Sequence, residues 1–177
     1  RQRQMCIRDS GSTALFHILG ITPEALHARD LNYQHLPEVV ITKEEVLGLQ
    51  DSYRIAEEID VVVFSAPQLS LMEMKSIAEL CDGKKFTKPL LAMTSPQVKP
   101  DSDRMGYTAM IENAGGTVFS GMCFYQSYAR EIAEANGWKV LATNSAKIVN
   151  ILGGYGYTPM LASMEDCVNA AVTGSLK

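Results

Sequence analysis

The sequence predicts an α/β fold built around a mostly parallel sheet. From residue 60 onward, five short apolar runs alternate with segments of helical periodicity, and small polar loops join them. This alternation is typical of successive parallel βα units. The 177 residues are 46% hydrophobic, which is enough to form one buried core. The expected strands are residues 61–65, 89–94, 117–120, 139–143 and 159–162.

Helix start signals follow the expected strands. Ser70 and Glu73 form a capping box, in which side chains satisfy free N–H groups of the first helical turn. Ser163 and Asp166 resemble a second one, with Asp in the last place. Residues 125–136 have helical periodicity throughout. The helices are expected to begin near Ser70, Ser102, Tyr125, Ser145 and Ser163.

Upstream of the repeated units, the sequence predicts two helical segments and one strand. Thr22 followed by Pro23 indicates a short helical turn, because Thr is a good N-cap and Pro suits the first helical position. The β-branched run at residues 39–41 predicts a short strand. A capping box at residues 42–45 predicts a helix that runs to about Glu57.

Residues 1–10 differ in character from the rest of the chain. They are charged, show no periodicity and do not begin with methionine. We therefore expect residues 1–10, including Cys6, to be extraneous sequence that takes no part in the fold. Residues 11–177 are expected to be a fragment of a longer working protein.

The composition excludes several classes of partner. A formal net charge of −4 disfavours binding to nucleic acid or to an acidic membrane surface. The longest apolar runs, such as residues 61–64, are far shorter than the roughly 20 residues that a membrane span needs. The four cysteines are widely spaced, with no CxxC pair and no secretory signal ahead of them. These features predict a cytoplasmic protein with reduced thiols.

Small, hydroxyl-rich loops follow the expected strands. Because right-handed crossovers bring these loops to one edge of a parallel sheet, we expect them to line a binding site there. Lys147 adds a cation beside a helix start, which suits a carboxylate or a phosphate. Ordinary helix capping is the alternative explanation for any single loop. The candidate substrate-binding residues are Ser65, Gln68, Thr94, Ser95, Asn144, Ser145 and Lys147.

Cys123 differs from the other cysteines because it lies in an expected loop over the sheet edge. Nearby backbone N–H groups favour a thiolate there, so Cys123 is a candidate metal or cluster ligand or a reactive thiol. A partly buried free thiol is the alternative. Cys81 and Cys167 fall on apolar helix faces and are expected in the core. The glycine cluster at residues 153–157 neither follows a strand nor opens a helix, which favours a turn over a phosphate loop.

Several of these residues together resemble the catalytic region of the aconitase X family. The resemblance runs from about residue 11 to the end of the chain, and its most specific element is Thr143-Asn144-Ser145-Ala146-Lys147. It implies an aconitase-like three-layer α/β/α architecture and a hydro-lyase, or dehydratase, acting on a small hydroxylated carboxylate. Known family members act on cis-3-hydroxy-L-proline or on mevalonate 5-phosphate. Of the two, we expect cis-3-hydroxy-L-proline as the substrate. If the substrate is mevalonate 5-phosphate, this chain would belong to the large subunit of the enzyme. The other matching runs are residues 11–17, 20–25, 60–70, 93–95, 163–174 and the Cys123 loop.

The resemblance also implies a cofactor and a partner. Family members use an iron–sulfur cluster as a Lewis acid, and Cys123 matches a cluster cysteine. Asn144, Ser145 and Lys147 match a loop that faces the substrate. A small swivelling domain closes over the site in the family. Since no segment here resembles that domain, we expect it in missing sequence or on a separate chain.

One loop departs from the family pattern. Residues 65–68 are Ser-Ala-Pro-Gln where many relatives have Gly-Cys-Pro-His. Ala66 therefore replaces an expected cysteine ligand of the cluster, and Gln68 replaces a histidine. The chain then works with a differently bound metal, works with none, or has lost activity. The last alternative is a non-catalytic binding or regulatory subunit that keeps the pocket without the cluster.

Overall fold

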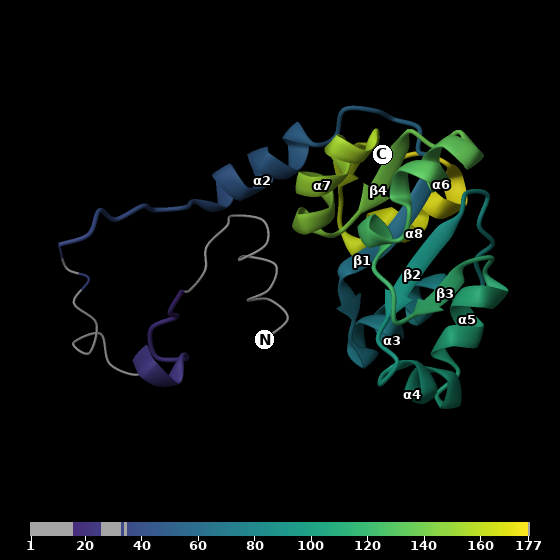
Figure 1. Ribbon diagram of the computed structural model, residues 1–177, viewed down its shortest axis with the longest axis horizontal. Helices are drawn as coiled ribbons and strands as arrows, with labels where there is room; N and C mark the ends of the chain where they lie inside the picture. Colours follow the sequence, from purple (N-terminus) through teal and green to yellow (C-terminus); the bar gives the residue numbers. More distant parts are fainter. Residues whose placement is uncertain (1–15, 26–32, 34, 177) are drawn as a thin grey trace.

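A five-stranded sheet, parallel throughout, forms the centre of the compact α/β part of the chain, on the right of Figure 1. The computed structural model describes residues 16–25, 33 and 35–176. The strand order is β3-β2-β1-β4-β5, so that β1 lies in the middle. The strands are β1 (Val61–Leu69), β2 (Leu90–Thr94), β3 (Thr117–Ser120), β4 (Val140–Thr143) and β5 (Thr158–Leu161). All five expected strands are therefore confirmed, although β1 continues four residues beyond its expected end at residue 65.

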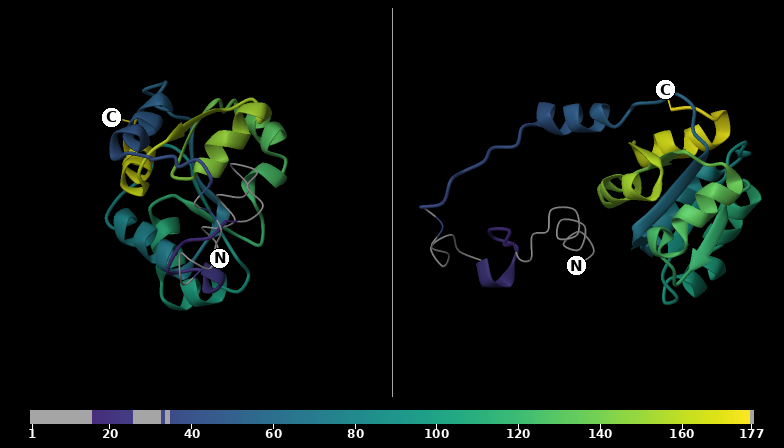
Figure 2. Two further views of the ribbon diagram at one scale, coloured as in Figure 1. Left: turned by 90° about the vertical axis from the view of Figure 1, so that its left-hand side faces the viewer. Right: turned by 45° about the horizontal axis from the view of Figure 1, so that its top comes forward.

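Helices connect and cover the strands (Figure 2). The α-helices are α2 (Lys43–Ser52), α3 (Leu71–Cys81), α4 (Lys99–Arg104), α5 (Tyr107–Asn113), α6 (Ala129–Asn136), α7 (Ala146–Leu152) and α8 (Met164–Thr173). The 3-10 turns are η1 (Pro23–Ala25), η3 (Phe124–Gln126) and η4 (Gly153–Tyr155). No helix in the described part of the chain is both long enough and apolar enough to cross a membrane.

The side chains of β1 divide between two hydrophobic clusters, one on each face of the sheet. Val62 and Phe64 pack with residues of α3, α5 and α8. Val61 and Val63 pack with residues of α6 and α7. The alternation follows from the two-residue period of a strand, and both faces are buried because helices cover both. The expected three-layer α/β/α architecture is thereby confirmed.

The segment before β1 corrects two predictions. Residues 39–41 form no strand, and their side chains are largely exposed. The capping box is confirmed, because Thr42 Oγ1 accepts the Glu45 N–H and the Glu45 carboxylate accepts the Thr42 N–H. The helix that it opens, α2, ends at Ser52 rather than at about Glu57, and none of its residues is buried. The expected turn after Thr22 is present as η1, while residues 1–15 lie outside the described part of the chain.

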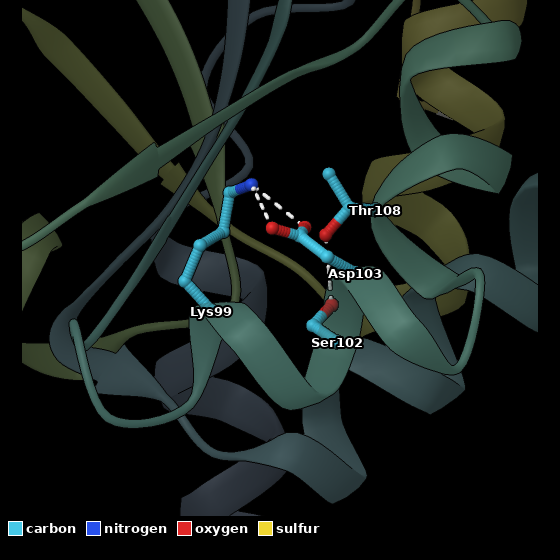
Figure 3. Close-up of polar contacts among 4 residues, drawn as sticks. All are labelled: Lys99, Ser102, Asp103 and Thr108. Carbon is cyan, nitrogen blue, oxygen red and sulfur yellow. Dashed lines mark hydrogen bonds and ion pairs between the residues drawn. The ribbon is translucent and has the colours of Figure 1, made fainter.

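Two helix boundaries after β1 also differ from the predictions. Instead of one helix starting near Ser102, α4 begins at Lys99 and a separate α5 begins at Tyr107, because Gly106 adopts a left-handed conformation between them. Ser102 and Thr108 join the two helices through a buried hydroxyl pair at 2.9 Å (Figure 3). Beside this pair, hydrogen bonds from Lys99 and Thr108 hold the pKa of Asp103 below its usual value.

The expected helix at residues 125–136 is broken as well. Its first residues form η3, and α6 begins only at Ala129 after Tyr128, which also has a positive φ. By contrast, α3, α7 and α8 begin directly after Ser70, Ser145 and Ser163, as predicted.

Asp60 links the start of β4 to the start of β1 through hydrogen bonds. Its carboxylate accepts the backbone N–H groups of Lys139 and Val140 at 2.7 and 2.8 Å. Burial acts to raise the pKa of Asp60, but these hydrogen bonds and nearby lysines outweigh it, so that the pKa lies below its usual value. The folded protein therefore prefers the ionised form more strongly than the unfolded chain does.

Protonation of Asp60 should consequently destabilise the fold. Its contribution should be complete above the unfolded pKa of about 3.9 and should disappear as the pH falls through the lower folded-state pKa. We expect Asp60→Ala to lower the free energy of unfolding at pH 7 by about 1–2 kcal/mol and by less at acid pH. Urea unfolding from pH 7 to pH 3 measures this. Asp51→Ala on exposed α2 is the control, and an equal loss at both ends of the pH range would contradict the assignment.

Candidate functional site

A pocket of about 390 Å³ lies at the carboxyl end of the sheet. It lies where the strand order reverses, because β1 neighbours both β2 and β4 there. Crevices at such switch points are the usual ligand sites of open α/β sheets. Three chain segments meet in the pocket: the end of β1, the loop after β3 and the start of α7. The lining residues are Ala66, Pro67, Gln68, Cys123, Tyr125, Gln126 and Lys147.

The Ser65 hydroxyl connects the end of β1 to the loop that carries Cys123. Ser65 is buried, and its Oγ accepts the N–H of Phe124 at 3.2 Å. The same hydroxyl donates toward the sulfur of Cys123 at 3.8 Å. Ser65 therefore holds Cys123 and its loop at the end of β1.

Ser145 connects β1 to the start of α7. Its hydroxyl donates to the carbonyl oxygen of Ala66 at 2.7 Å, and its Oγ accepts the N–H of Ile148, which caps the helix. Ala66 has a positive φ of 50° and precedes a cis peptide bond to Pro67. The Ser145 hydroxyl thus holds the backbone of the β1 loop against α7, on which Lys147 lies.

Lys147 is the cation of the pocket. It is only 7% exposed, and its Nζ lies 5.2 Å from the centre of the Tyr125 ring. A cation over an aromatic face is stabilised by the ring quadrupole, and the effect grows as water is removed. Because a buried cation attracts anions more strongly than an exposed one does, the pocket is suited to a carboxylate or a phosphate.

The pocket brings together three of the predicted site residues. Gln68, Cys123 and Lys147 line it, and the Gln68 amide donates to the carbonyl oxygen of Met122 at 3.1 Å. Ser65 and Ser145 do not line the pocket, but their hydroxyl groups hold the segments that do.

The other three predicted residues lie outside its lining. Thr94 is fully buried and donates to the carbonyl oxygen of Leu69, while the Ser95 hydroxyl accepts the N–H of Val98. Asn144 is half-buried at the end of β4. Tyr125 and Gln126 line the pocket but were not predicted, because the sequence placed them on a helix rather than in η3.

The residues of this pocket do not by themselves fit an iron–sulfur cluster. Within the described residues, no three His, Cys, Asp or Glu side chains are grouped closely enough to hold a metal ion. Ala66 occupies the position in the lining at which the resemblance implies a second cysteine. Cys123 is therefore the one cysteine that the described part of this chain offers in the pocket.

The three described cysteines should react at very different rates. Cys81 and Cys167 are buried, as predicted, and burial raises the pKa of Cys81 to about 11 and also raises that of Cys167. Cys123 is half-buried and lines the pocket. In a Cys6→Ser background, we expect iodoacetamide to alkylate Cys123 at least about tenfold faster than the other two, as measured by peptide mass spectrometry. Equal rates for Cys123 and Cys81 would contradict the pocket geometry.

Comparisons with known proteins agree with this architecture. A sequence profile described as the aconitase X third domain matches residues 59–173. The phosphomevalonate dehydratase large subunit of Methanocaldococcus jannaschii is 35% identical over 139 residues, covering 78% of this chain and 33% of that protein. The cis-3-hydroxy-L-proline dehydratase of Pseudomonas aeruginosa is 28% identical over 175 residues, covering 93% of this chain and 29% of that protein. The chain thus spans about a third of the length of these curated relatives.

A solved structure gives the same result at the level of the fold. The crystal structure of aconitase X from Thermococcus kodakaraensis, in its holo form, superposes with a TM-score of 0.74 at 28% identity. The superposition covers 86% of this chain and 38% of that one. Since the profile match alone includes more than half of the residues, the chain belongs to the aconitase X family, and residues 59–173 are its third domain.

Proposed function

We propose that this chain is part of a hydro-lyase that removes water from a small hydroxylated carboxylate. The main support for the proposal is the pocket at the carboxyl end of the sheet. It places a buried cation, Lys147, where α/β sheets bind ligands. The relatives support the reaction class, since both kinds are named dehydratases. Their names give two substrates to test, phosphomevalonate and cis-3-hydroxy-L-proline.

In this proposal, the residues of this chain bind and orient the substrate. Lys147 pairs with a carboxylate or phosphate of the substrate, and the Tyr125 ring keeps the ammonium in place. Ser65 and Ser145 fix the loops from which Cys123 and Ala66 face the pocket. In the overall reaction a base takes a proton from the carbon beside the carboxylate, and the hydroxyl group on the next carbon takes up a proton from an acid and leaves as water.

We further propose that residues 11–177 are the carboxyl-terminal part of the catalytic region. A small swivelling domain, in further sequence or on a separate subunit, would complete the site. The relatives support a longer protein, because this chain covers only 33% and 29% of them, and one kind is named a large subunit. An iron–sulfur cluster in the completed site would need thiolates beyond Cys123, which must come from those other parts. The free thiols of Cys81, Cys123 and Cys167 fit a cytoplasmic location.

The direct test is an assay of the completed protein with both substrates. We expect the protein to remove water from phosphomevalonate or from cis-3-hydroxy-L-proline. Mass spectrometry of the product measures this loss. Iron and acid-labile sulfide, measured on protein purified without oxygen, show whether a cluster accompanies activity. Turnover of neither substrate by well-folded, iron-loaded protein would contradict the proposal.

A non-catalytic binding or regulatory subunit is the second candidate. The observation that favours it is Ala66, which leaves Cys123 as the only thiol that the described residues contribute to the pocket lining. An active cluster enzyme needs Cys123, whereas a binding protein should tolerate Cys123→Ser with unchanged affinity. Dehydratase activity that survives Cys123→Ser would exclude Cys123 as a cluster ligand.

A further inference from the structure

A second and larger cavity lies at the opposite edge of the sheet. Its volume is about 570 Å³, within the range of small-molecule sites. It is bordered by α6, by the two residues that precede β4 and by the glycine turn η4 that precedes β5. Because the amino ends of parallel strands share one edge, this cavity is separate from the pocket that contains Cys123 and Lys147.

Two cations border this cavity. The Arg130 guanidinium donates one hydrogen bond to the carbonyl oxygen of Gly154 at 3.0 Å, which joins α6 to the glycine turn across the opening. Among the described residues, no carboxylate forms an ion pair with Arg130 or Lys139. Arginine presents five N–H donors, so its remaining donors are available to an incoming carboxylate or phosphate.

Two aromatic rings form walls of the same cavity. Trp138 and Tyr155 are both half-buried, and both pack against the hydrophobic cluster that α6 and α7 form with the sheet. This packing fixes the rings, so that little conformational freedom is lost when a flat ligand stacks on them. The carboxylate of Glu134, one helical turn after Arg130, adds an acceptor for an N–H group of such a ligand.

The glycines keep the cavity open. A Cβ atom added at Gly153 or Gly154 would meet no atom within 4 Å, so the space above the turn is empty of protein. Neither residue has the positive φ that disfavours larger side chains. A bulky residue can therefore replace Gly154 without backbone strain and would occupy the cavity itself.

We propose that this cavity binds a small anion that carries a flat ring, such as a nucleoside monophosphate. The anionic group pairs with Arg130 and Lys139, and the ring lies against Trp138 and Tyr155. The binding is independent of the dehydratase function, because no residue of this cavity lines the pocket at the carboxyl edge.

The chain contains its own reporter for this site. Trp138 is the only tryptophan in the sequence, so intrinsic fluorescence excited at the red edge of the tryptophan band reports on this cavity alone. We expect adenosine 5′-monophosphate to change the Trp138 fluorescence saturably. Adenosine, which lacks the anion, and inorganic phosphate, which lacks the ring, should each bind at least about tenfold more weakly.

Variants separate specific binding from a general quenching effect. Gly154→Leu should abolish the response by filling the cavity, and Arg130→Gln should weaken it about tenfold or more. Arg104→Gln is the matched control, because the Arg104 side chain is exposed on α4, and it should leave the response unchanged. Thermal unfolding checks that each variant is folded. A response that is absent in the unsubstituted chain, or that persists in folded Gly154→Leu, would overturn the proposal.

Discussion

Replacement of Phe64 by alanine is expected to remove about 3–5 kcal/mol from the free energy of unfolding. Phe64 is completely buried on the central strand β1, between the sheet and the helices α3, α5 and α8. The substitution removes the transfer free energy of the ring and leaves a cavity that helices on a rigid sheet cannot fill. Because domains of this kind are stable by about 5–15 kcal/mol, a large part of the total should be lost.

Equilibrium unfolding in urea measures this loss. Met72→Ala is the matched control, because Met72 is 66% exposed on α3 and its truncation should change the stability by less than about 0.5 kcal/mol. If Phe64→Ala lost less than about 1 kcal/mol, the central position of β1 in a two-sided core would be wrong.

Replacement of Lys147 by methionine is expected to lower kcat/KM of the completed enzyme about 100-fold. The substitution keeps the length of the side chain but removes the one cation that the described part of the chain places in the pocket lining. Loss of one partner from a buried charged pair costs about 2–5 kcal/mol, and about 2.7 kcal/mol corresponds to 100-fold. Since methionine is well tolerated in buried positions, the fold should remain intact.

Steady-state kinetics with the better of the two substrates measures this effect. Lys99→Met is the control, because Lys99 pairs with Asp103 on α4, away from the pocket lining (Figure 3). It should leave kcat/KM unchanged within about twofold. Equal losses in the two variants would show that charge in general, rather than the cation of the pocket, supports turnover.

The sequence was most informative where burial on both sheet faces determines the pattern. All five strands could be predicted, because each is a short apolar run between polar loops. Residues 39–41 show the limit of that reasoning. They are equally β-branched, but β-propensity acts only when a neighbouring strand is present, and these residues pair with none in the described structure.

Helix boundaries were less predictable because single residues with positive φ decide them. Gly106 separates α4 from α5, and Tyr128 separates η3 from α6. Periodicity continues across both breaks, so it gives no signal of them. The glycine in the first case is a recognisable punctuation, but a tyrosine at φ 58° is rare and has no sequence signature.

The site was partly predictable for the same reasons. Cys123 and Lys147 could be placed at the carboxyl edge from the strand pattern alone, and both line the pocket. Tyr125 and Gln126 depend on the break at Tyr128, so they were not predictable. The inward contact of the Thr94 hydroxyl with Leu69 depends on the extension of β1 beyond residue 65, which the sequence did not indicate.

The central claim, that the substrate occupies the pocket of Cys123 and Lys147, can be tested by protection of Cys123 from alkylation. The experiment uses the completed protein with Cys6→Ser, freed of iron by a chelator so that no cluster occupies Cys123. It follows Cys123 labelling by iodoacetamide with and without phosphomevalonate or cis-3-hydroxy-L-proline. We expect one of the two substrates to slow labelling of Cys123 by about tenfold or more at saturation, and we expect Lys147→Met to remove this protection. Labelling of Cys123 at an unchanged rate, at a substrate concentration that saturates turnover by the untreated enzyme, would contradict this assignment.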